Sequence, residues 1–593
     1  MGRSVICLGL SLLLCSALNQ KVNSVETGET FRNGGTAGKE GTGDTRGTER
    51  TGETGRTEET KETAGTERTK RTGGTERTEK FGGIKGSGGT DWTGRLLVVP
   101  MDGSHWTGLK AVAEELGRRG HMVVVVMPEV SIRLDSGKHY ITKTFPVPYG
   151  QETLDELQAR NTEVMQSTPR PLLERINTRI SHLKKFAHYQ MTTSQALLLN
   201  QELMDFVKQQ RFDAVLTSPA VPTGAILAFN LSLPAVYMLR GLPCGLDSKA
   251  TACPNPPSYI PRFFTKNSDR MRWSERVLNV LVSVLEPVLC KVLYWSFEEL
   301  ASSMIGRSIS LGEILSSGAL WLLRYDFTLE FPKPLMPNMV LIGGLNCAIT
   351  SPLSPEVEEF VEGSGEHGLV VFTLGSLVSS MPKEKAAIFF QAFSQIPQRV
   401  VWRYTGELPD HVPDNVKLMK WLPQNDLLGH PKTRAFITHG GTHGIYEGIC
   451  HAVPMVILPL FGDQGDNAHR MANRGVGLVL DIHEITPESL SNTLHTIIND
   501  TSYKEKMVKL SSIHKDRPTE PLDLAVFWTE FVMRHKGADH LRPAAHDLNW
   551  FQYHSLDVIG FLLLVIMIVV AALMKCCVLC LRRYCKSEKK KKD

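Results

Sequence analysis

Residues 421–471 read WLPQNDLLGHPKTRAFITHGGTHGIYEGICHAVPMVILPLFGDQGDNAHRM. Two apolar runs, AFIT and PMVILPL, alternate with turns that are dense in Gly, His, Asp and Gln. Such runs are typical of strands that are buried on both faces of a parallel sheet. Ligands of open α/β sheets bind beyond the carboxyl ends of the strands, where these polar turns would lie. The stretch therefore predicts an α/β fold with a ligand site at one edge of a sheet.

The segment THGGTHGIYEG, residues 438–448, has the pattern of a strand, a glycine turn and the start of a helix. This geometry directs backbone N–H groups and the positive end of a helix dipole at one point. Anions, phosphates above all, bind at such helix N-termini. The segment therefore predicts a phosphate site.

The order of the polar residues in this stretch resembles the signature of nucleotide-sugar glycosyltransferases of the GT-B type. The residues that carry the likeness are Trp421, Gln424, His439, Gly440, Gly441, Glu447, Asp463 and Gln464. The later segments 523–538 and 540–563 are similar to vertebrate UDP-glucuronosyltransferases, most of all to the family-1 branch that handles bilirubin and phenols. The resemblance covers residues 94 to about 585 and is strongest after Ser308.

The resemblance implies a role for each residue that would hold the nucleoside and the sugar. Trp421 would stack on the uracil and Gln424 would contact its ribose, since an indole offers a flat face and an amide can donate and accept. Glu447 would accept from the ribose hydroxyls. Asp463 and Gln464 would hold the hydroxyls of the transferred sugar. A lone tryptophan is usually core and a lone glutamate usually solvated surface, so only the ordered set favours a ligand site.

The same resemblance implies a set of diphosphate contacts. His439 would touch the diphosphate, with Gly441, Thr442 and His443 around it, and Ser376 in the strand-and-turn FTLGS would add a further contact. Helix N-termini and a histidine can offset the charge of a leaving diphosphate, so this chemistry needs no metal ion. We see no acidic cluster suited to magnesium and expect no metal or cofactor besides the co-substrate, UDP-glucuronate.

His105, in the turn MDGSHW after the first strand, is the candidate for the general base. It would stand at the carboxyl end of that strand, and the pKa of histidine lies near operating pH. The alternative is a histidine that only caps a loop. In the family the equivalent histidine takes a proton from the acceptor, and attack opposite the diphosphate would give a β-glucuronide.

Ser218 marks a departure from the family pattern. The family places an aspartate after the strand FDxxLxD, whereas this chain reads FDAVLTSP. A carboxylate there would hold the imidazole tautomer and stabilise the imidazolium, and a serine carries no charge to do so. Asp213 is near in sequence but belongs to the other end of the strand. The enzyme would then be slow, or selective for acidic acceptors such as phenols and carboxylic acids, or inactive.

The leading hypothesis is transfer of glucuronic acid from UDP-glucuronate to small lipophilic acceptors such as phenols, steroids, bilirubin-like compounds or carboxylic acids. One alternative keeps the fold and changes the donor to another UDP-sugar, such as UDP-glucose. A non-enzyme alternative is a weak homologue that binds UDP-sugar and serves as partner subunit to active relatives. This alternative predicts homo- or hetero-oligomers with related transferases.

Length and charge limit the remaining classes. The chain has 593 residues, more than one hydrophobic core usually supports, so two or more domains are expected. Its net charge of +4 does not indicate nucleic-acid binding. Five of the eleven cysteines would lie in the folded part, and an odd count leaves at least one thiol unpaired. They show no metal-ligand spacing: Cys244, Cys253, Cys290, Cys347 and Cys450.

The two ends of the chain indicate a membrane protein. Residues 1–17 have the basic, apolar and small-residue regions of a secretory signal peptide. Residues 558–574 are uncharged and long enough to span a bilayer, and the basic tail 575–593 follows them. The positive-inside rule makes this a single-pass type I protein with lumenal domains. The Lys590-Lys591-Lys592-Asp593 end resembles a dilysine signal of the endoplasmic reticulum membrane.

The middle of the chain predicts a GT-B plan, with two Rossmann-like domains that face a cleft. Residues 24–93 repeat Thr, Gly, Glu and Arg with almost no apolar side chains, which predicts a disordered linker. Residues 94–345 would be the acceptor-binding domain and 350–535 the UDP-sugar-binding domain. Residues 271–301 predict an apolar helix that lines an acceptor pocket or touches the membrane, with ordinary core packing as the default. Residues 336–356 resemble an interdomain linker.

Overall fold

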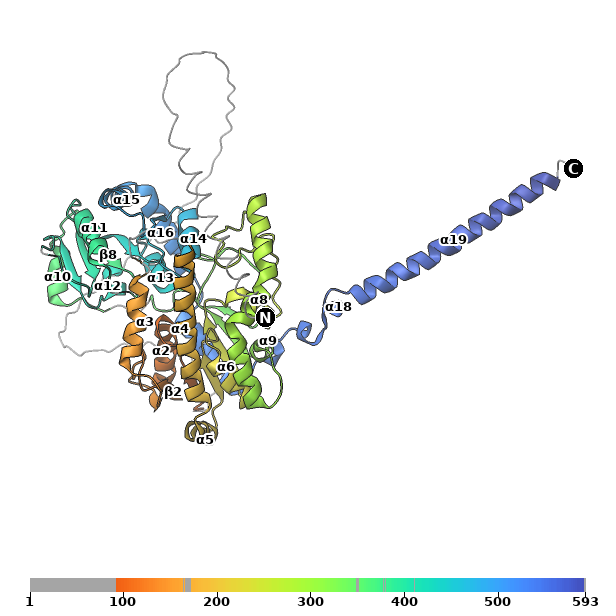
Figure 1. Ribbon diagram of the computed structural model, residues 1–593, viewed down its shortest axis with the longest axis horizontal. Helices are drawn as coiled ribbons and strands as arrows, with labels where there is room; N and C mark the ends of the chain where they lie inside the picture. The colour runs from red at the N-terminus through yellow and green to blue at the C-terminus, as the bar shows by residue number, and fades with distance from the viewer. Residues whose placement is uncertain are drawn as a thin grey trace, which may run out of the picture. The chain divides into compact units, whose positions relative to one another are not determined.

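The computed structural model describes residues 92–163, 165, 172–347, 351–376, 378, 380–409 and 411–590. A parallel sheet of seven strands forms the first half, in the order β3-β2-β1-β4-β5-β6-β7. In Figure 1 this half is coloured from red to green. Its strands are β1 (Arg95–Val99), β2 (Met122–Pro128), β3 (Ile141–Phe145), β4 (Ala214–Thr217), β5 (Ala235–Leu239), β6 (Leu320–Leu323) and β7 (Met339–Leu341).

Helices connect these strands, as a parallel sheet requires. They are α2 (Ser104–Arg118), α3 (Gln151–Glu163), α4 (Leu172–Leu198), α5 (Gln201–Gln210), α6 (Thr223–Asn230), α7 (Leu246–Ala250), α8 (Trp273–Ile305) and α9 (Leu311–Ser316), with a short 3₁₀ turn η1 (Pro243–Gly245).

A second parallel sheet of six strands, ordered β10-β9-β8-β11-β12-β13, forms the other half. Its strands are β8 (Leu369–Thr373), β9 (Arg399–Arg403), β10 (Val416–Met419), β11 (Thr433–Thr438), β12 (Met455–Ile457) and β13 (Gly477–Val479). The helices around it are α10 (Pro355–Glu362), α11 (Lys383–Phe393), α12 (Gln424–Gly429), α13 (Thr442–Cys450), α14 (Gln464–Asn473), α15 (Pro487–Asn499) and α16 (Thr501–Lys515).

Alternate residues of each strand enter different cores, because successive side chains of a strand point to opposite faces of its sheet. On β1, Leu97 belongs to one core, which includes side chains of α5, α6 and α8, and Leu96 belongs to another that includes side chains of α2. On β8, Val371 joins the first of these cores, and Phe372 enters a third with side chains of α11 and α15. Both sheets are therefore covered on two faces, and one core runs through both halves.

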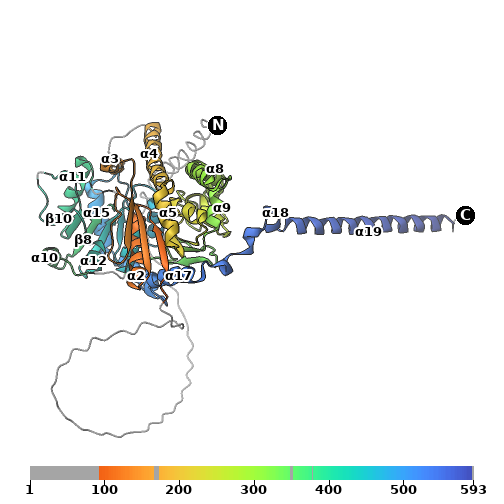
Figure 2. The ribbon, with the colours of Figure 1, turned by 90° about the horizontal axis from the view of Figure 1, so that it is seen from below.

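The chain returns to the first sheet before it ends. Helix α17 (Pro521–His535) packs beside α2, and the two lie next to each other in Figure 2. Arg119 of α2 pairs with Asp523 at 2.7 Å, and Lys536 pairs with Asp213. The turns η2 (Asp539–Leu541) and η3 (Ala544–Asp547) and helices α18 (Trp550–Tyr553) and α19 (Leu556–Lys590) complete the chain.

The structure confirms the α/β class and the expected strands, and it corrects two expectations. The segment 336–356 is not only a linker, because Met339–Leu341 forms the outer strand of the first sheet. Helix α8 does not pack as ordinary core, since only 17% of its most apolar stretch of 18 residues is buried. The predictions for residues 1–17 and 24–93 concern residues outside those that the structure describes, apart from Trp92 and Thr93. Leu556–Tyr584, with a mean hydropathy of 3.0, is long and apolar enough to cross a membrane.

Candidate active site

His105 and Ser218 come together because their strands are neighbours. Val99 of β1 pairs with Thr217 of β4, so the carboxyl ends of the two strands lie side by side. His105 stands in the first turn of α2, and its Nδ1 lies 2.9 Å from Ser218 Oγ. Asp213, at the other end of β4, accepts from Arg95 N at 2.7 Å, as the sequence predicted for a residue that faces away.

The surroundings of His105 disfavour its protonated form. Burial and the positive charge of Arg324 lower the pKa of His105 to about 4, and the carboxylate of Asp463 raises it only in part. Within the described residues no carboxylate lies within hydrogen-bonding distance of the ring. The imidazole is therefore neutral at physiological pH and able to accept a proton, but it is a weak base.

His439 directly follows β11 and packs between glycines. A Cβ on Gly375, whose φ is +83°, would lie 2.4 Å from Cε1 of His439, and one on Gly441 would lie 2.4 Å from Nε2. Ser376 follows Gly375 in the turn after β8, so the loops after two adjacent strands meet at this ring. Burial lowers the pKa of His439 to about 4. Its Nδ1 is buried and has no hydrogen-bond partner in the described chain, which is rare for a buried polar group.

His443, in the first turn of α13, joins the two halves of the molecule. Its Nε2 lies 2.9 Å from the carbonyl oxygen of Ser104, and its Nδ1 lies 3.3 Å from Asn346 Nδ2. Nε2 also contacts the guanidinium of Arg324, which can only donate, so this ring nitrogen lies against one acceptor and one donor. Burial and then Arg324 hold the pKa of His443 well below its usual value. Helix α13 thus touches the residue directly before His105.

Asp463 caps the N-terminus of α14, and Gln464 is its first residue. Of the two side chains, only that of Asp463 contacts other candidate site residues. Oδ2 of Asp463 accepts from Arg240 at 3.0 Å and from Thr442 Oγ1 at 3.3 Å. The side-chain oxygen Oε1 of Gln464 instead accepts hydrogen bonds from two backbone N–H groups of the preceding loop, that of Leu460 at 2.8 Å and that of Phe461 at 3.0 Å. Any sugar contact of Gln464 must therefore use its amide nitrogen.

Gln424 and Glu447 lie against each other, from α12 and α13. The amide of Gln424 donates to the carboxylate of Glu447. Burial raises the pKa of Glu447 to about 7, although the Gln424 hydrogen bond acts in the opposite direction. A buried carboxylate with an amide beside it can accept from two neighbouring hydroxyl groups, which is what the proposed ribose contact needs.

Trp421 is 55% exposed and is contacted by cations. The guanidinium groups of Arg133 and Arg403 lie 4.3 and 5.0 Å from its ring centroid. Both carbon centres lie within the range of a cation–π contact. These cations occupy part of the indole surface on which a uracil would stack.

Two arginines of the site were missed in the sequence. Arg240 and Arg324 are the first residues after β5 and β6, where α/β sites form, so the strand-end rule could have found both. Arg324 is buried, and burial lowers its pKa to about 10. Its guanidinium contacts His443, and no described carboxylate lies within 4.0 Å of it. It is thus a buried cation, close to His105, that lacks a direct anionic partner.

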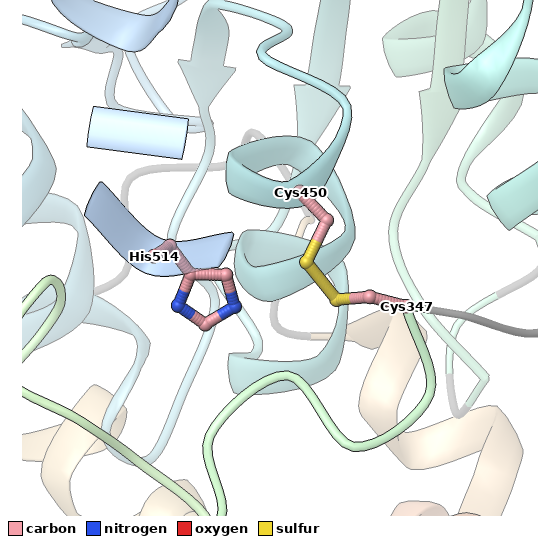
Figure 3. Close-up of side chains that lie close together, drawn as sticks. All are labelled: Cys347, Cys450 and His514. Atoms are coloured by element: carbon pink, nitrogen blue, oxygen red, sulfur yellow. A yellow bond between two sulfur atoms is a disulfide. The ribbon is translucent and has the colours of Figure 1, made fainter. Parts of the chain in front are cut away.

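A disulfide joins the segment after β7 to the last residue of α13. Cys347 and Cys450 are joined with an S–S distance of 2.00 Å, and His514 lies beside them (Figure 3). His514 Nδ1 lies at hydrogen-bonding distance, 2.6 Å, from the carboxylate of Asp326. The two sulfurs are thus bonded to each other, and the histidine is paired with Asp326. Cys244, Cys253 and Cys290 are free thiols, in line with the odd count.

Solved structures of other proteins share this two-sheet fold. The glycosyltransferase VinC in complex with DTDP matches with a TM-score of 0.51 at 19% identity, over 74% of this chain and 100% of that chain. The spinosyn forosaminyltransferase SpnP matches with a TM-score of 0.50 at 18% identity, over 74% and 99%. The fold is that of a two-domain GT-B glycosyltransferase.

Sequence comparisons identify the family. A family model described as "UDP-glucoronosyl and UDP-glucosyl transferase" matches residues 94–591. Human UDP-glucuronosyltransferase 1A6 is 54% identical over 471 residues, which cover 79% of this chain and 88% of the relative. Human UDP-glucuronosyltransferase 1A1 is 50% identical over 471 residues with the same coverage. The chain belongs to the UDP-glucuronosyl and UDP-glucosyl transferase family.

Proposed function

We propose that the chain transfers glucuronic acid from UDP-glucuronate to small lipophilic acceptors that carry hydroxyl or carboxyl groups. The observation that carries the proposal is the contact between the two halves: His443 of the donor-binding helix lies 2.9 Å from the carbonyl of Ser104, the neighbour of His105. The candidate base and the candidate diphosphate site therefore face the same space. The family and the identity to UDP-glucuronosyltransferases support this reaction.

The donor-binding residues keep the roles that the sequence suggested, as proposals. The N-terminus of α13 and the unpaired Nδ1 of His439 would face the diphosphate. Glu447 and Gln424 would hold the ribose, and Asp463, fixed by Arg240, would accept from a hydroxyl of the sugar. Developing charge on the leaving diphosphate is stabilised best by donors that are already oriented.

The acceptor side supplies the proton transfer. Nδ1 of His105 is hydrogen-bonded to Ser218 Oγ, so Nε2 is the ring nitrogen that would accept the proton of the acceptor hydroxyl. As the acceptor oxygen attacks the anomeric carbon, its proton moves to Nε2 and the bond to the diphosphate breaks on the opposite face. The anomeric centre is inverted and the product is a β-glucuronide.

Arg324 supports glucuronate rather than glucose as the transferred sugar. It is a buried cation near His105, His443 and Asp463, and therefore near the sugar end of the donor rather than its base. A planar guanidinium matches a carboxylate with two parallel hydrogen bonds. UDP-glucose has no carboxylate to offer it.

The location follows from the chain ends, again as a proposal. Leu556–Tyr584 would span the endoplasmic reticulum membrane once, with both sheets in the lumen and the basic tail in the cytosol. The lysine-rich end would be read as a retrieval signal. Lumenal conditions are oxidising and agree with the Cys347–Cys450 disulfide.

The test of the function is glucuronide formation by microsomes that contain the chain, UDP-glucuronate and a phenol. His105→Ala should lower kcat by about 10²-fold, the lower end of the range for a general base, because the imidazole is a weak one here. Binding of UDP should stay unchanged, since the base belongs to the acceptor side. Product from the wild type that does not exceed the His105→Ala level would contradict the proposal.

A second candidate function rests on one observation, the serine in contact with His105. With no carboxylate on Nδ1, the chain would bind UDP-sugar, turn over slowly and act as a partner subunit of active relatives. Under this alternative, UDP-glucuronate binds normally while the glucuronide yield stays at background for every acceptor tested.

Binding of the donor should depend on pH through Glu447. The carboxylate form accepts from ribose hydroxyls, and below a pKa of about 7 the group gains a proton and loses that capacity. Affinity for UDP-glucuronate should therefore fall by up to about ten-fold for each pH unit below 7, and level off above it. Calorimetric titration with UDP-glucuronate measures this, and it avoids the terminal phosphate of UDP, which titrates in the same range.

Glu447→Gln is the matched control for that titration. The amide keeps the shape and one acceptor oxygen but does not titrate. Its donor affinity should be lower at pH 8 and nearly constant between pH 6 and 8. An equal pH dependence in wild type and variant would show that another group titrates.

A further inference from the structure

The first half of helix α8 buries two polar side chains, Asn279 and Glu286, and turns apolar side chains outward, whereas its last turns bury apolar residues in the core. Asn279 is fully buried and its amide donates to the carbonyl oxygens of Pro257 and Ile260. Glu286 is 7% exposed and lies 3.8 Å from Arg262. A surface helix of a water-soluble protein has the opposite arrangement. The buried hydrogen bonds fix this orientation of α8 on the fold.

The outward face of α8 is one continuous apolar stripe. Its members follow each other at intervals of three or four residues, so they lie on one side of the helix. The exposed fractions are 39% for Val277, 54% for Leu281, 68% for Val284, 42% for Val288, 55% for Val292 and 48% for Trp295. At 1.5 Å per residue, the stripe from Val277 to Trp295 is about 27 Å long.

We propose that this stripe lies in the lumenal interface of the bilayer that α19 spans, an inference that rests on the proposed membrane anchoring. Residues 536–555 join α17 to α19, a connection that reaches at most about 70 Å. Every copy of the folded part is therefore held close to a lipid surface, whereas no partner chain is guaranteed. An apolar helix face that lies flat in the interface buries the stripe without a specific partner.

The residues at the borders of the stripe fit an interface between lipid and water. Trp273 is 74% exposed at the first turn, and Trp295 lies near the other end with Lys291 over its ring at 5.3 Å. Tryptophan prefers the headgroup level, and lysine can extend its ammonium group from an apolar surface to water. Arg276 at the first turn adds a cation that attracts anionic headgroups.

The position of α8 gives this contact a consequence for catalysis. α8 packs against α4, α6 and α9 of the first sheet, the half that carries His105. Lipophilic acceptors concentrate in the bilayer, so membrane contact by α8 holds the acceptor side next to their source.

Photo-crosslinking of the full chain in lipid nanodiscs tests the proposal. A benzophenone amino acid replaces Leu281 on the stripe, Ile513 of α16 as the matched control, or Val565 of α19 as the anchor control. Leu281 and Ile513 are 54% and 56% exposed, so solvent access to the two probes is equal without lipid. Mass spectrometry then identifies lipid adducts after illumination. We expect abundant lipid adducts at 281 and 565 and background at 513.

The controls separate the possible failures. Adducts at 565 with background at 281 would overturn the contact of α8 and leave the anchor intact. Background at 565 would instead refute the anchoring on which the inference rests. Adducts between two chains at 281, in place of lipid adducts, would assign the stripe to a second copy and likewise overturn the proposal. Catalytic activity is not a readout, so failure of the proposed reaction does not affect the result.

Discussion

Replacing Ser218 by aspartate should raise kcat for glucuronide formation by at least about ten-fold and at most about 10⁴-fold, the upper figure being the loss when the acidic partner of an analogous triad is removed. Ser218 Oγ already lies 2.9 Å from Nδ1 of His105, so a carboxylate at this position needs little movement to accept from the ring. It would fix the tautomer and stabilise the imidazolium that forms as the acceptor loses its proton.

The pH profile of the Ser218→Asp variant gives an independent readout. The wild-type imidazole, with a pKa of about 4, is neutral above that pH, so the acid limb of kcat/KM for the acceptor, measured at saturating UDP-glucuronate, should lie near pH 4. A carboxylate beside the ring favours its charged form and raises the pKa of His105. The acid limb should therefore move to higher pH in the variant, while the rate on the plateau increases.

Ser218→Asn is the matched control, because it adds nearly the same volume at a buried position without the charge. Its kcat should stay near that of the wild type, and donor affinity should be the same in all three proteins. If aspartate and asparagine change the rate equally, or if aspartate leaves it unchanged, the missing carboxylate does not limit the enzyme.

Much of the fold could be predicted because the signals are local. Apolar runs such as LLVVP and AFIT can only be buried strands in a chain with this pattern, and helical segments between them require parallel sheets. The short strand Met339–Leu341 was missed because three residues carry too little pattern to distinguish them from a linker. Helix α8 was misjudged because periodicity locates an apolar face but does not say what covers it.

Candidate site residues could be predicted where they directly follow a strand in the sequence. Contacts between residues far apart in the sequence could not. His439 and Asp463 are motif positions; in the structure Asp463 accepts from Thr442, and its charge acts on His439. The contact between His443 and Ser104 joins residues 339 positions apart, which no local pattern reports. The sequence also could not show that the side-chain oxygen of Gln464 accepts a hydrogen bond from the backbone of its own loop.

Arg324→Leu should change the donor preference. For UDP-glucuronate, kcat/KM should fall by about 10²-fold, since removing one partner of a buried, hydrogen-bonded charge pair costs several kcal/mol. For UDP-glucose it should change little, because glucose carries no carboxylate to pair with the guanidinium. Leucine fills part of the same space without charge, and a panel of UDP-sugars with one phenol as acceptor measures the ratio between donors.

Two comparisons decide whether Arg324 acts on the sugar carboxylate or elsewhere. Arg324→Lys keeps the charge but loses the two-pronged geometry, so it should retain part of the preference for UDP-glucuronate. Affinity for UDP alone should be unchanged in both variants, because UDP lacks the sugar. Equal losses with UDP-glucuronate and UDP-glucose, together with weaker UDP binding, would place Arg324 on the diphosphate. Equal losses with unchanged UDP binding and a lower melting temperature would instead mean that its contact with His443 holds the two halves together.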